Sequence, residues 1–525
     1  MKQPKSASKR VVMNTGILYA KMGITMFISL YTTRLILNSL GASDFGIFNI
    51  VGGAIAMLGF LNAAMAGATQ RFMSYAEGAG NIENQKSIFN ISVILHFLIA
   101  IMVGIVLLIA GYFFFHAILN IPIERMNAAR LVYYCMIIST MFTVMTVPYD
   151  AVLNAHENML YYAIVGIIQS ILNLSVAFIV IRTNSDKLIV YGALMAGISL
   201  LVMVSMRMYC HKKYIECEFR PKIYYDNALM KEMTRFAGWN FLASVSNIIG
   251  QNGLGIVLNS FFGTVLNTAQ GIANQLCGQL QTFSNTMLKA LNPIIAKSEG
   301  AGKRRLMLQS SLTGSKFSFC LVTIVTIPFL IDTPYIMRIW LKNTPDWSVV
   351  FFRFQVARTL IEQLTVVLGT SVFAQGNIAN YSKIKSFINI LPILLTTLLF
   401  YLGGPPYSMY IVWILCWSII GGCINLYYAV TKCELSINEY FNNVVKPCAI
   451  LFSGVFFITF IPYIFFPIGI IRFLSMCIAA FISFAILFWY FTLNNYEKNI
   501  LLKIIAELKM KIRRNPTYMK NNYMM

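Results

Sequence analysis

This sequence has few charged residues. Only 11% of its 525 residues are Asp, Glu, Lys or Arg, and 58% are hydrophobic. Soluble domains carry about 25% charged residues because water must solvate their surface. The composition therefore excludes a soluble protein and predicts that lipid surrounds much of the chain.

Histidine, paired cysteine and long loops are also scarce. The four histidines lie in different segments, with no H-E-x-x-H spacing. The ten cysteines include no C-x-x-C pair, so we interpret them as small buried hydrophobic residues rather than disulfides or metal ligands. The longest loops, 334–346 and 211–232, are too short for a folded catalytic domain. The sequence therefore predicts no enzyme activity, no cofactor and no metal site.

Long apolar stretches make up most of the chain. A helix needs about 20 apolar residues to cross a bilayer, and hydropathy and turn residues predict about fourteen such spans. They are expected near residues 11–40, 44–75, 88–115, 127–150, 159–182, 187–210, 233–262, 264–297, 308–332, 347–374, 383–403, 406–432, 444–467 and 469–493. The predicted fold class is an all-α polytopic membrane protein with both termini on one side.

Basic residues outnumber acidic ones, and the formal net charge is +22. Most Lys and Arg residues fall in loops on one side of the predicted membrane, including the tail after Asn494. The positive-inside rule assigns that side, and hence both termini, to the cytoplasm. The basicity therefore indicates topology and does not indicate nucleic acid as a partner.

An internal repeat organises the spans. Residues 74–80 (SYAEGAG) and 296–302 (AKSEGAG) both follow a long predicted helix, at an offset of 222 residues, and the same offset aligns Gly41 with Gly263. Residues 155–158 and 374–377 match more weakly, at an offset of 219. We interpret this as duplication of a unit of about six helices, which gives two parallel copies with substrate expected between them.

The repeat predicts the domain organisation. We expect an N-terminal lobe at 1–210, a cytoplasmic linker at 211–232, a C-terminal lobe at 233–432, two added transmembrane helices at 433–493 and a basic cytoplasmic tail at 494–525.

The eighth predicted span carries polar residues at spacings of three and four, on one helical face. These are Asn267, Gln270, Asn274, Gly278, Gln281, Asn285, Lys289 and Asn292. Span 7 adds Asn247 and Gln251. Unpartnered amides are costly in lipid, so the face lines either a hydrated cavity or an interhelical hydrogen-bond seam. We expect the cavity, with the amides binding substrate.

Cations inside the predicted spans point to the substrate. The candidates for a cationic cavity are Lys21, Arg34, Arg71, Lys289, Lys316 and Arg358. Intramembrane charge is expensive and often lines a pathway, although Arg34 and Arg71 lie near span ends, where snorkelling explains them equally well. Arg, Lys and amide groups suit phosphate oxygens and sugar hydroxyls. The implied substrate is therefore anionic and polar.

Glu362 is the one carboxylate expected well inside a span. It lies four residues after Arg358, so the two side chains share a helical face and can meet. The pair is either structural, keeping each charge solvated, or an ion-coupling site that opens during transport. Both interpretations stay open on the sequence alone.

The first two spans resemble bacterial O-antigen and capsule flippases of the multidrug, oligosaccharidyl-lipid and polysaccharide exporter superfamily. The similarity is in Asn14–Gly16, in 34–41 (RLILNSLG), in 44–48 (DFGIF) and in Gly52 and Gly53. It implies two lobes that alternate their access and move an undecaprenyl-diphosphate-linked oligosaccharide to the outer leaflet of the inner membrane. Implied partners are membrane lipid, a polysaccharide polymerase, a chain-length regulator and a coupling H⁺ or Na⁺.

Two other functions remain as alternatives. A multidrug or small-solute antiporter related to MATE transporters could use the same scaffold, although drug exporters of the superfamily often keep an acidic residue in span 1, where this sequence has Lys21 and Arg34. A membrane-embedded enzyme would need a catalytic loop or a His and carboxylate constellation, which the sequence lacks.

Overall fold

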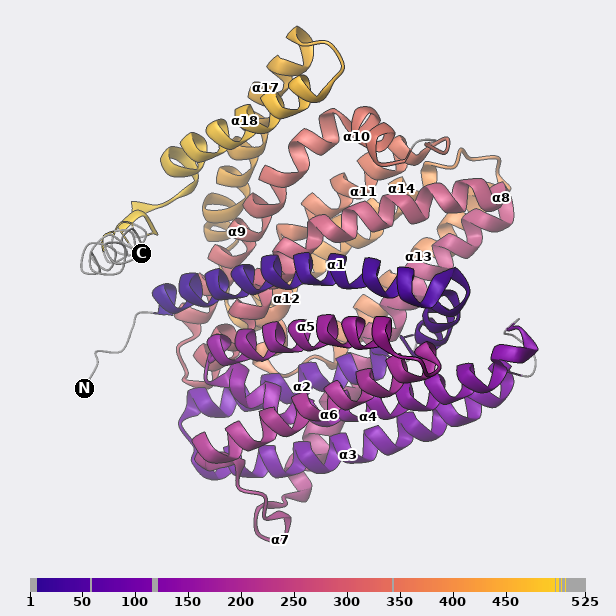
Figure 1. Ribbon diagram of the computed structural model, residues 1–525. Coiled ribbons are helices and arrows are strands. Elements are labelled where there is room, and N and C mark those ends of the chain that lie inside the picture. The colour runs from indigo at the N-terminus through magenta and orange to yellow at the C-terminus, as the bar shows by residue number, and fades with distance from the viewer. Residues whose placement is uncertain are drawn as a thin grey trace, which may run out of the picture.

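The computed structural model describes residues 7–56, 59–115, 121–341, 344–495, 497–499, 502 and 506. Within these ranges every regular element is helical, and most helices run side by side in one bundle (Figure 1). The N-terminal helices are α1 (Ala7–Ala56), α2 (Gly59–Ala79), α3 (Ile82–Phe113), α4 (Met126–Ala155), α5 (Met159–Arg182) and α6 (Lys187–Lys213). The short α7 (Pro221–Tyr224) follows them. The predicted all-α fold is confirmed.

The second set of helices begins with α8. It comprises α8 (Asn227–Gly300), α9 (Arg304–Ile331), α10 (Thr333–Trp340), α11 (Ser348–Gln363), α12 (Val366–Gln375), α13 (Ala379–Tyr401), α14 (Ser408–Trp413), the π-helix η4 (Ile414–Ile420) and α15 (Gly421–Cys433). After them come α16 (Ile437–Tyr440), η5 (Phe441–Val445), α17 (Lys446–Phe465), α18 (Ile470–Leu487) and η6 (Phe488–Thr492). Below, "N-terminal half" means α1 to α6 and "C-terminal half" means α8 to α15.

Among the described residues, 10 helices are long and apolar enough to cross a membrane, or 11 if the bent pair α11 and α12 is one span. The count is lower than about fourteen partly because α8, with 74 residues, contains two of the expected spans. At 1.5 Å per residue, a straight helix of this length would far exceed the hydrocarbon thickness of about 30 Å. The multi-pass architecture is therefore roughly as expected.

Two glycines bend the long helices. Gly41 in α1 has φ 79° and ψ 167°, and Gly263 in α8 has φ 78° and ψ −173°. Residues with side chains rarely adopt this positive φ. The two positions are 222 residues apart, so the structure shows the backbone equivalence that the repeat predicts. The side of the bundle with both bends is called the kink end.

The opposite side carries the second pair of equivalent turns. Gly80 (φ 71°) follows α2, and Gly302 (φ 69°) follows α8. The connecting segment 214–226 also lies here, because the Asn90 side chain near the start of α3 donates to the Glu218 carbonyl at 2.8 Å and accepts from the Arg220 backbone at 2.8 Å. This side is called the linker end.

The two halves meet closely at the linker end. A Cβ at Gly78 of α2 would lie 2.0 Å from the carbonyl oxygen of Lys297, and a Cβ at Gly300 of α8 would lie 2.0 Å from that of Tyr75. Both contacts have the same form, and their residues are 222 apart. Only glycine permits this backbone approach, so α2 and α8 cross here about an approximate two-fold axis.

The added helices α17 and α18 pack on α9, at the upper left of Figure 1. A buried ion pair joins Arg472 of α18 to Asp332 after α9, at 2.9 and 2.5 Å. Another joins Lys316 of α9 to Glu497 at 2.6 Å. The two pairs hold the C-terminal helices against the C-terminal half.

Candidate functional site

Two predicted cations meet between the halves. Lys21 of α1 places its Nζ 4.2 Å from the ring centroid of Tyr162 on α5, and Lys289 of α8 places its Nζ 3.7 Å from the same centroid. Cation–π contact stabilises an ammonium group at such a distance. Asp150 near the end of α4 interacts electrostatically with both lysines. The cluster has two cations and one carboxylate, so its net charge is positive.

Apolar contacts fix this cluster in place. Leu18, Met159 and Ala290 form a buried group that packs against Tyr162, and each lies within a turn of a cluster residue. Gly166 faces Lys21, since a Cβ there would lie 2.3 Å from the lysine Cε. The lysines are therefore positioned by packing that joins α1, α5 and α8.

The amide face of α8 is only partly a cavity wall. Asn267, Asn274 and Asn285 are exposed, as a hydrated face requires. Gln270 is buried, and Gln281 donates to the Thr359 hydroxyl of α11 at 3.1 Å. Gln281 thus belongs to an interhelical seam, and both sequence interpretations hold for different residues of one stripe.

The first half of α8 carries the other two predicted amides. Gln251 donates to the Asn247 side-chain oxygen at 2.8 Å, one helical turn away. Gln251 is exposed, and Asn247 lines the cavity described below.

Four predicted cations lie away from the Tyr162 cluster, and one of them, Arg358, contacts Trp413 and Glu362 instead. Arg34 is exposed on α1. Arg71 donates to the Ala374 carbonyl oxygen from Nε at 3.3 Å and from Nη2 at 3.0 Å. Lys316 is buried, and its ammonium is already neutralised by Glu497. A paired buried charge is not free to receive an anion, so this ion pair favours a structural role for Lys316.

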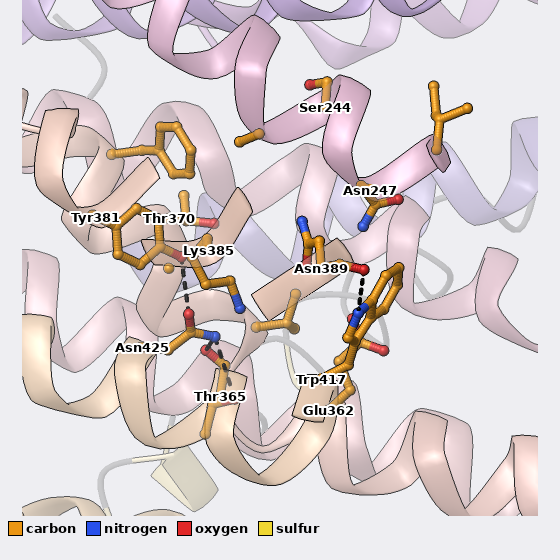
Figure 2. A pocket seen from close by; sticks show the side chains of 15 residues that line it. Ser244, Asn247, Glu362, Thr365, Thr370, Tyr381, Lys385, Asn389, Trp417 and Asn425 are labelled. Carbon is orange, nitrogen blue, oxygen red and sulfur yellow. Dashed lines mark hydrogen bonds between the residues drawn. The ribbon is translucent and has the colours of Figure 1, made fainter. Parts of the chain in front are cut away.

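The C-terminal half contains a cavity of about 470 Å³ with several polar side chains in its walls (Figure 2). Its walls come from the first part of α8, from α11, α12 and α13, and from η4 and α15. Polar side chains that line it are Ser244, Asn247, Glu362, Thr365, Thr370, Tyr381, Lys385, Asn389 and Asn425. We call it the inner cavity.

Glu362 and Arg358 form the contact that their spacing predicts. Arg358 Nη1 lies 2.8 Å from Glu362 Oε2. The arginine is buried, with its guanidinium 4.6 Å from the Trp413 ring, whereas the Glu362 side chain is 35% exposed. The carboxylate is therefore the solvated partner, and it opens on the inner cavity.

A break between helices shapes the cavity wall. α11 and α12 meet at an angle of 41°, and Thr365 lies between them. Asn425 of α15 donates to the Thr365 carbonyl at 3.2 Å and accepts from the Tyr381 hydroxyl at 2.9 Å (Figure 2). Backbone groups released by a break must find partners in a membrane, and Asn425 supplies one.

Known proteins share this architecture. Residues 20–179 match the MatE family model. An outward-facing multidrug resistance MATE family transporter aligns with a TM-score of 0.67 at 13% identity, over 82% of this chain and 99% of that one. A MATE in the bent conformation gives 0.70 at 13% identity, over 81% and 95%. The chain has the MATE fold.

A third structure with the MATE fold is a transporter from Pyrococcus furiosus of the MOP superfamily. It aligns with a TM-score of 0.64 at 13% identity, over 82% of this chain and 99% of that one. The binding pocket of that transporter has reverse polarity, which suggests a different function for it. No curated protein matches the sequence.

Sequence reasoning missed Lys385 and Asp150. Lys385 donates to the Gly421 carbonyl at 3.3 Å and interacts electrostatically with Glu362 across the inner cavity. Both residues fall at expected span boundaries, where charge attracts little notice. The spacing of Tyr381, Lys385 and Asn389, four residues apart along α13, is the signal that could have found the cavity face.

Proposed function

We propose that this protein is a transporter that moves an undecaprenyl-diphosphate-linked oligosaccharide from the cytoplasmic to the outer leaflet of the bacterial inner membrane. The observation that carries the proposal is the pair of ammonium groups, Lys21 and Lys289, on one tyrosine between the halves. Such a pair suits the two phosphates of a lipid diphosphate.

Each half contributes one cation to this pair. Lys21 belongs to α1 and Lys289 to α8, so an anion between them contacts both halves. Relative movement of the halves would change the distance between the two ammonium groups. We propose that the diphosphate binds both lysines in one state and that the exposed amides Asn267, Asn274 and Asn285 solvate the sugars.

The MATE fold supports transport by alternating access. The proteins with this fold include a multidrug resistance transporter. Fold alone is weak evidence for a substrate, so the anionic specificity rests on the charges of this chain. The reverse polarity of the pocket in the Pyrococcus furiosus transporter is a precedent for different pocket charges on one scaffold.

We propose that Glu362 couples transport to H⁺ or Na⁺. Its carboxylate is the exposed member of the pair with Arg358 and faces the inner cavity. A carboxylate that can lose its arginine partner can bind a cation. The pair then acts in coupling rather than only in folding.

The linker end is assigned to the cytoplasm in this proposal. Reporter fusions after residues 80, 220 and 515 should then report cytoplasm, and a fusion near residue 340 should report the outside. An inversion at any of these positions would contradict the topology. The expected partners are membrane lipid, a polysaccharide polymerase and a chain-length regulator.

A MATE-like antiporter for drugs or small solutes is the second candidate. The match of residues 20–179 to the MatE family model and the fold likeness to a multidrug transporter favour it. A cationic drug would meet two lysines and one carboxylate in the Tyr162 cluster, and we therefore rank this candidate second.

Accumulated intermediates distinguish the two candidates. The gene is deleted in its own host, and lipid-linked oligosaccharide is extracted from the inner leaflet and quantified. Flippase function predicts accumulation of the lipid-linked repeat unit and loss of surface polysaccharide. Unchanged polysaccharide together with increased sensitivity to cationic drugs would establish the antiporter instead.

A further inference from the structure

Three cavities lie along the same helices, and the inner cavity is the deepest from the linker end. A cavity of about 420 Å³ at the linker end is lined by polar residues that include Asn84, Glu232 and Asn377. A smaller one of about 180 Å³ is lined by residues that include Gln70, Asn240 and Asn292. We call the first, which is nearest the linker end, the outer-mouth cavity, and the second the middle cavity.

The order of the cavities follows from three segments of the chain: the start of α8, residues 362–377, and α2, which lines two of the three cavities. On α8 the outer-mouth cavity is lined at 229 and 232, the middle cavity at 236 and 240, and the inner cavity at 243–248. Along α11, α12 and the two residues after α12, the outer-mouth cavity is lined at 375–377, the middle cavity at 370–374 and the inner cavity at 362–373. On α2 the outer-mouth cavity is lined at 72 and 75 and the middle cavity at 67 and 70.

Neighbouring cavities share walls. Thr370 and Phe373 line both the middle and the inner cavity. Arg71 lines both the outer-mouth and the middle cavity. Arg71 therefore lies between the outer-mouth cavity and the middle cavity, and the middle cavity adjoins the inner cavity that Glu362 lines.

Arg71 is held across the boundary between the halves. Its guanidinium donates twice to the Ala374 carbonyl and lies 4.8 Å from the Tyr75 ring and 5.4 Å from the Phe236 ring. Gly376 lies directly beside it, because a Cβ there would be 2.4 Å from Arg71 Nη2. The positive φ of 99° at Gly376 also requires glycine. The missing Cβ leaves room for the guanidinium, and the backbone conformation independently requires glycine at this position.

We propose that these cavities form an access route for water and protons from the linker end to Glu362, and that Arg71 is its gate. In the present state the side chain closes the route by its bulk, and its positive charge repels cations, as arginines do in selective pores. Separation of the halves at the linker end would break the contact with Ala374 and open the route. The role of Glu362 as the end point rests on the proposed coupling function.

Opening of the route would break specific contacts between the two halves. Besides Arg71 and Ala374, Lys297 of α8 pairs with Glu77 of α2 at 2.9 Å. Arg71 also interacts electrostatically with Glu232, which lines the outer-mouth cavity. In the proposed open position, the guanidinium leaves Ala374 and pairs with Glu232 in the outer-mouth cavity.

Cysteine accessibility tests the gate. Thr370→Cys lies beyond Arg71, and Asn377→Cys lies before it. The probe is a small, charged, membrane-impermeant thiol reagent, added to inverted vesicles so that it reaches only the cytoplasmic face. Reaction is measured as the increment over protein with its native cysteines alone. We expect Asn377→Cys to react rapidly and Thr370→Cys at least about tenfold more slowly.

Opening the gate should then expose position 370. Arg71→Met removes the donors and the charge, and Gly376→Ala displaces the side chain without changing it. Both should raise the reaction rate of Thr370→Cys about tenfold. Arg71→Met should leave Asn377→Cys unchanged, and Arg182→Met, at an exposed arginine outside the predicted site, should change neither rate. The gate would be overturned if Thr370→Cys reacted at the same rate with Arg71 intact, with Arg71→Met and with Gly376→Ala, at normal protein abundance. Rapid reaction of Thr370→Cys with Arg71 intact would do the same.

Glu362 itself is the second readout. A water-soluble carbodiimide added at the cytoplasmic face should modify Glu362 several-fold faster in Arg71→Met, as measured by peptide mass, with Glu362→Gln as the blank. Exposure of position 370 without faster modification of Glu362 would show that the route ends before the inner cavity. The assays contain no oligosaccharide, so their failure would leave the proposed substrate standing, and failure of the substrate would leave the gate standing.

Discussion

The N-terminal and C-terminal halves have equivalent backbone turns. Gly41 and Gly263 bend α1 and α8 in the same way, and Gly80 and Gly302 follow α2 and α8 with the same positive φ. The charged side chains of the two halves nevertheless differ. The C-terminal half contains the buried charges Arg358 and Lys316 and the inner cavity. In the N-terminal half, Arg125 binds Asp44 and Asp186 at the kink end, where all three side chains are partly exposed.

The difference continues along the equivalent helix faces. At the offset of 222, Lys289 corresponds to Gly67 and Lys21 corresponds to Ala243. Each lysine of the Tyr162 cluster therefore has a small residue as its equivalent in the other copy. The turns and the packing at the linker end are common to both copies, whereas the cationic pair consists of side chains that the copies do not share.

We expect the largest effect when the two lysines that distinguish the halves are removed together. Lys21→Gln with Lys289→Gln removes the two proposed charge-assisted contacts to the diphosphate, and such contacts are each worth about 1.5–3 kcal/mol. We expect at least about a hundredfold loss of transport, measured as surface polysaccharide, with lipid-linked units accumulating in the inner leaflet.

The matched control is Lys231→Gln, because Lys231 is exposed at the start of α8 and its loss changes only net charge. Normal polysaccharide from the double variant at normal abundance would mean that these lysines do not bind substrate.

Buried charge should matter more in the C-terminal half than exposed charge in the N-terminal half. Lys316→Met leaves Glu497 buried without its partner, which costs about 3–5 kcal/mol. Arg125→Met breaks partly exposed pairs, which are worth about 1 kcal/mol. Thermal unfolding in detergent should therefore show the larger loss for Lys316→Met. A larger loss for Arg125→Met would reverse the comparison.

Glu362→Gln separates folding from coupling. The substitution leaves Arg358 in contact with Trp413 and Gln355, and the exposed Glu362 position can be hydrated. We expect normal protein abundance, about a tenfold loss of transport, and no remaining dependence of transport on pH or on the ion gradient. Glu439→Gln, at an exposed residue, is the control. Loss of folded protein would assign the pair a structural role, and normal transport would remove Glu362 from the site.

The smallest effect concerns the linker segment 214–226. The hydrogen bond from Lys86 lowers the pKa of Glu218 below its ordinary value of 4.5. Because the pKa is lower in the folded state, this contact stabilises docking above pH 4.5 and is lost as the pH falls through the lowered pKa. Hydrogen exchange of the linker, expressed relative to the intrinsic exchange rate at each pH, should speed up over that acidic range. In Lys86→Gln it should be faster at neutral pH already, and an unchanged profile would contradict the role of the contact.

The sequence is a good guide to the fold and to contacts within a helix. Hydropathy and the repeat predict the helices and the equivalence of Gly41 with Gly263, because apolar length and positive-φ glycine are local requirements. The spacing of Arg358 and Glu362 predicts their contact for the same reason.

Partners that are far apart in the chain could not be predicted. Lys316 resembles a cavity cation in the sequence because Glu497, which neutralises it, lies 181 residues away. Lys21 and Lys289 are both expected in the cavity, but Tyr162, which places them together, carries no sequence signal. The sequence allows Arg71 to be a cavity cation or a snorkelling residue, and its contact with Ala374 in the other half is visible only in the structure.

Transport of the lipid in a purified system tests the central claim most directly. The protein is reconstituted into proteoliposomes that contain an undecaprenyl-diphosphate-linked oligosaccharide, and glycan exposure on the opposite leaflet is followed with an impermeant glycosidase or lectin. We predict protein-dependent exposure that Lys21→Gln with Lys289→Gln abolishes and Lys231→Gln retains. Uptake of a cationic drug with no movement of the lipid-linked oligosaccharide would contradict it.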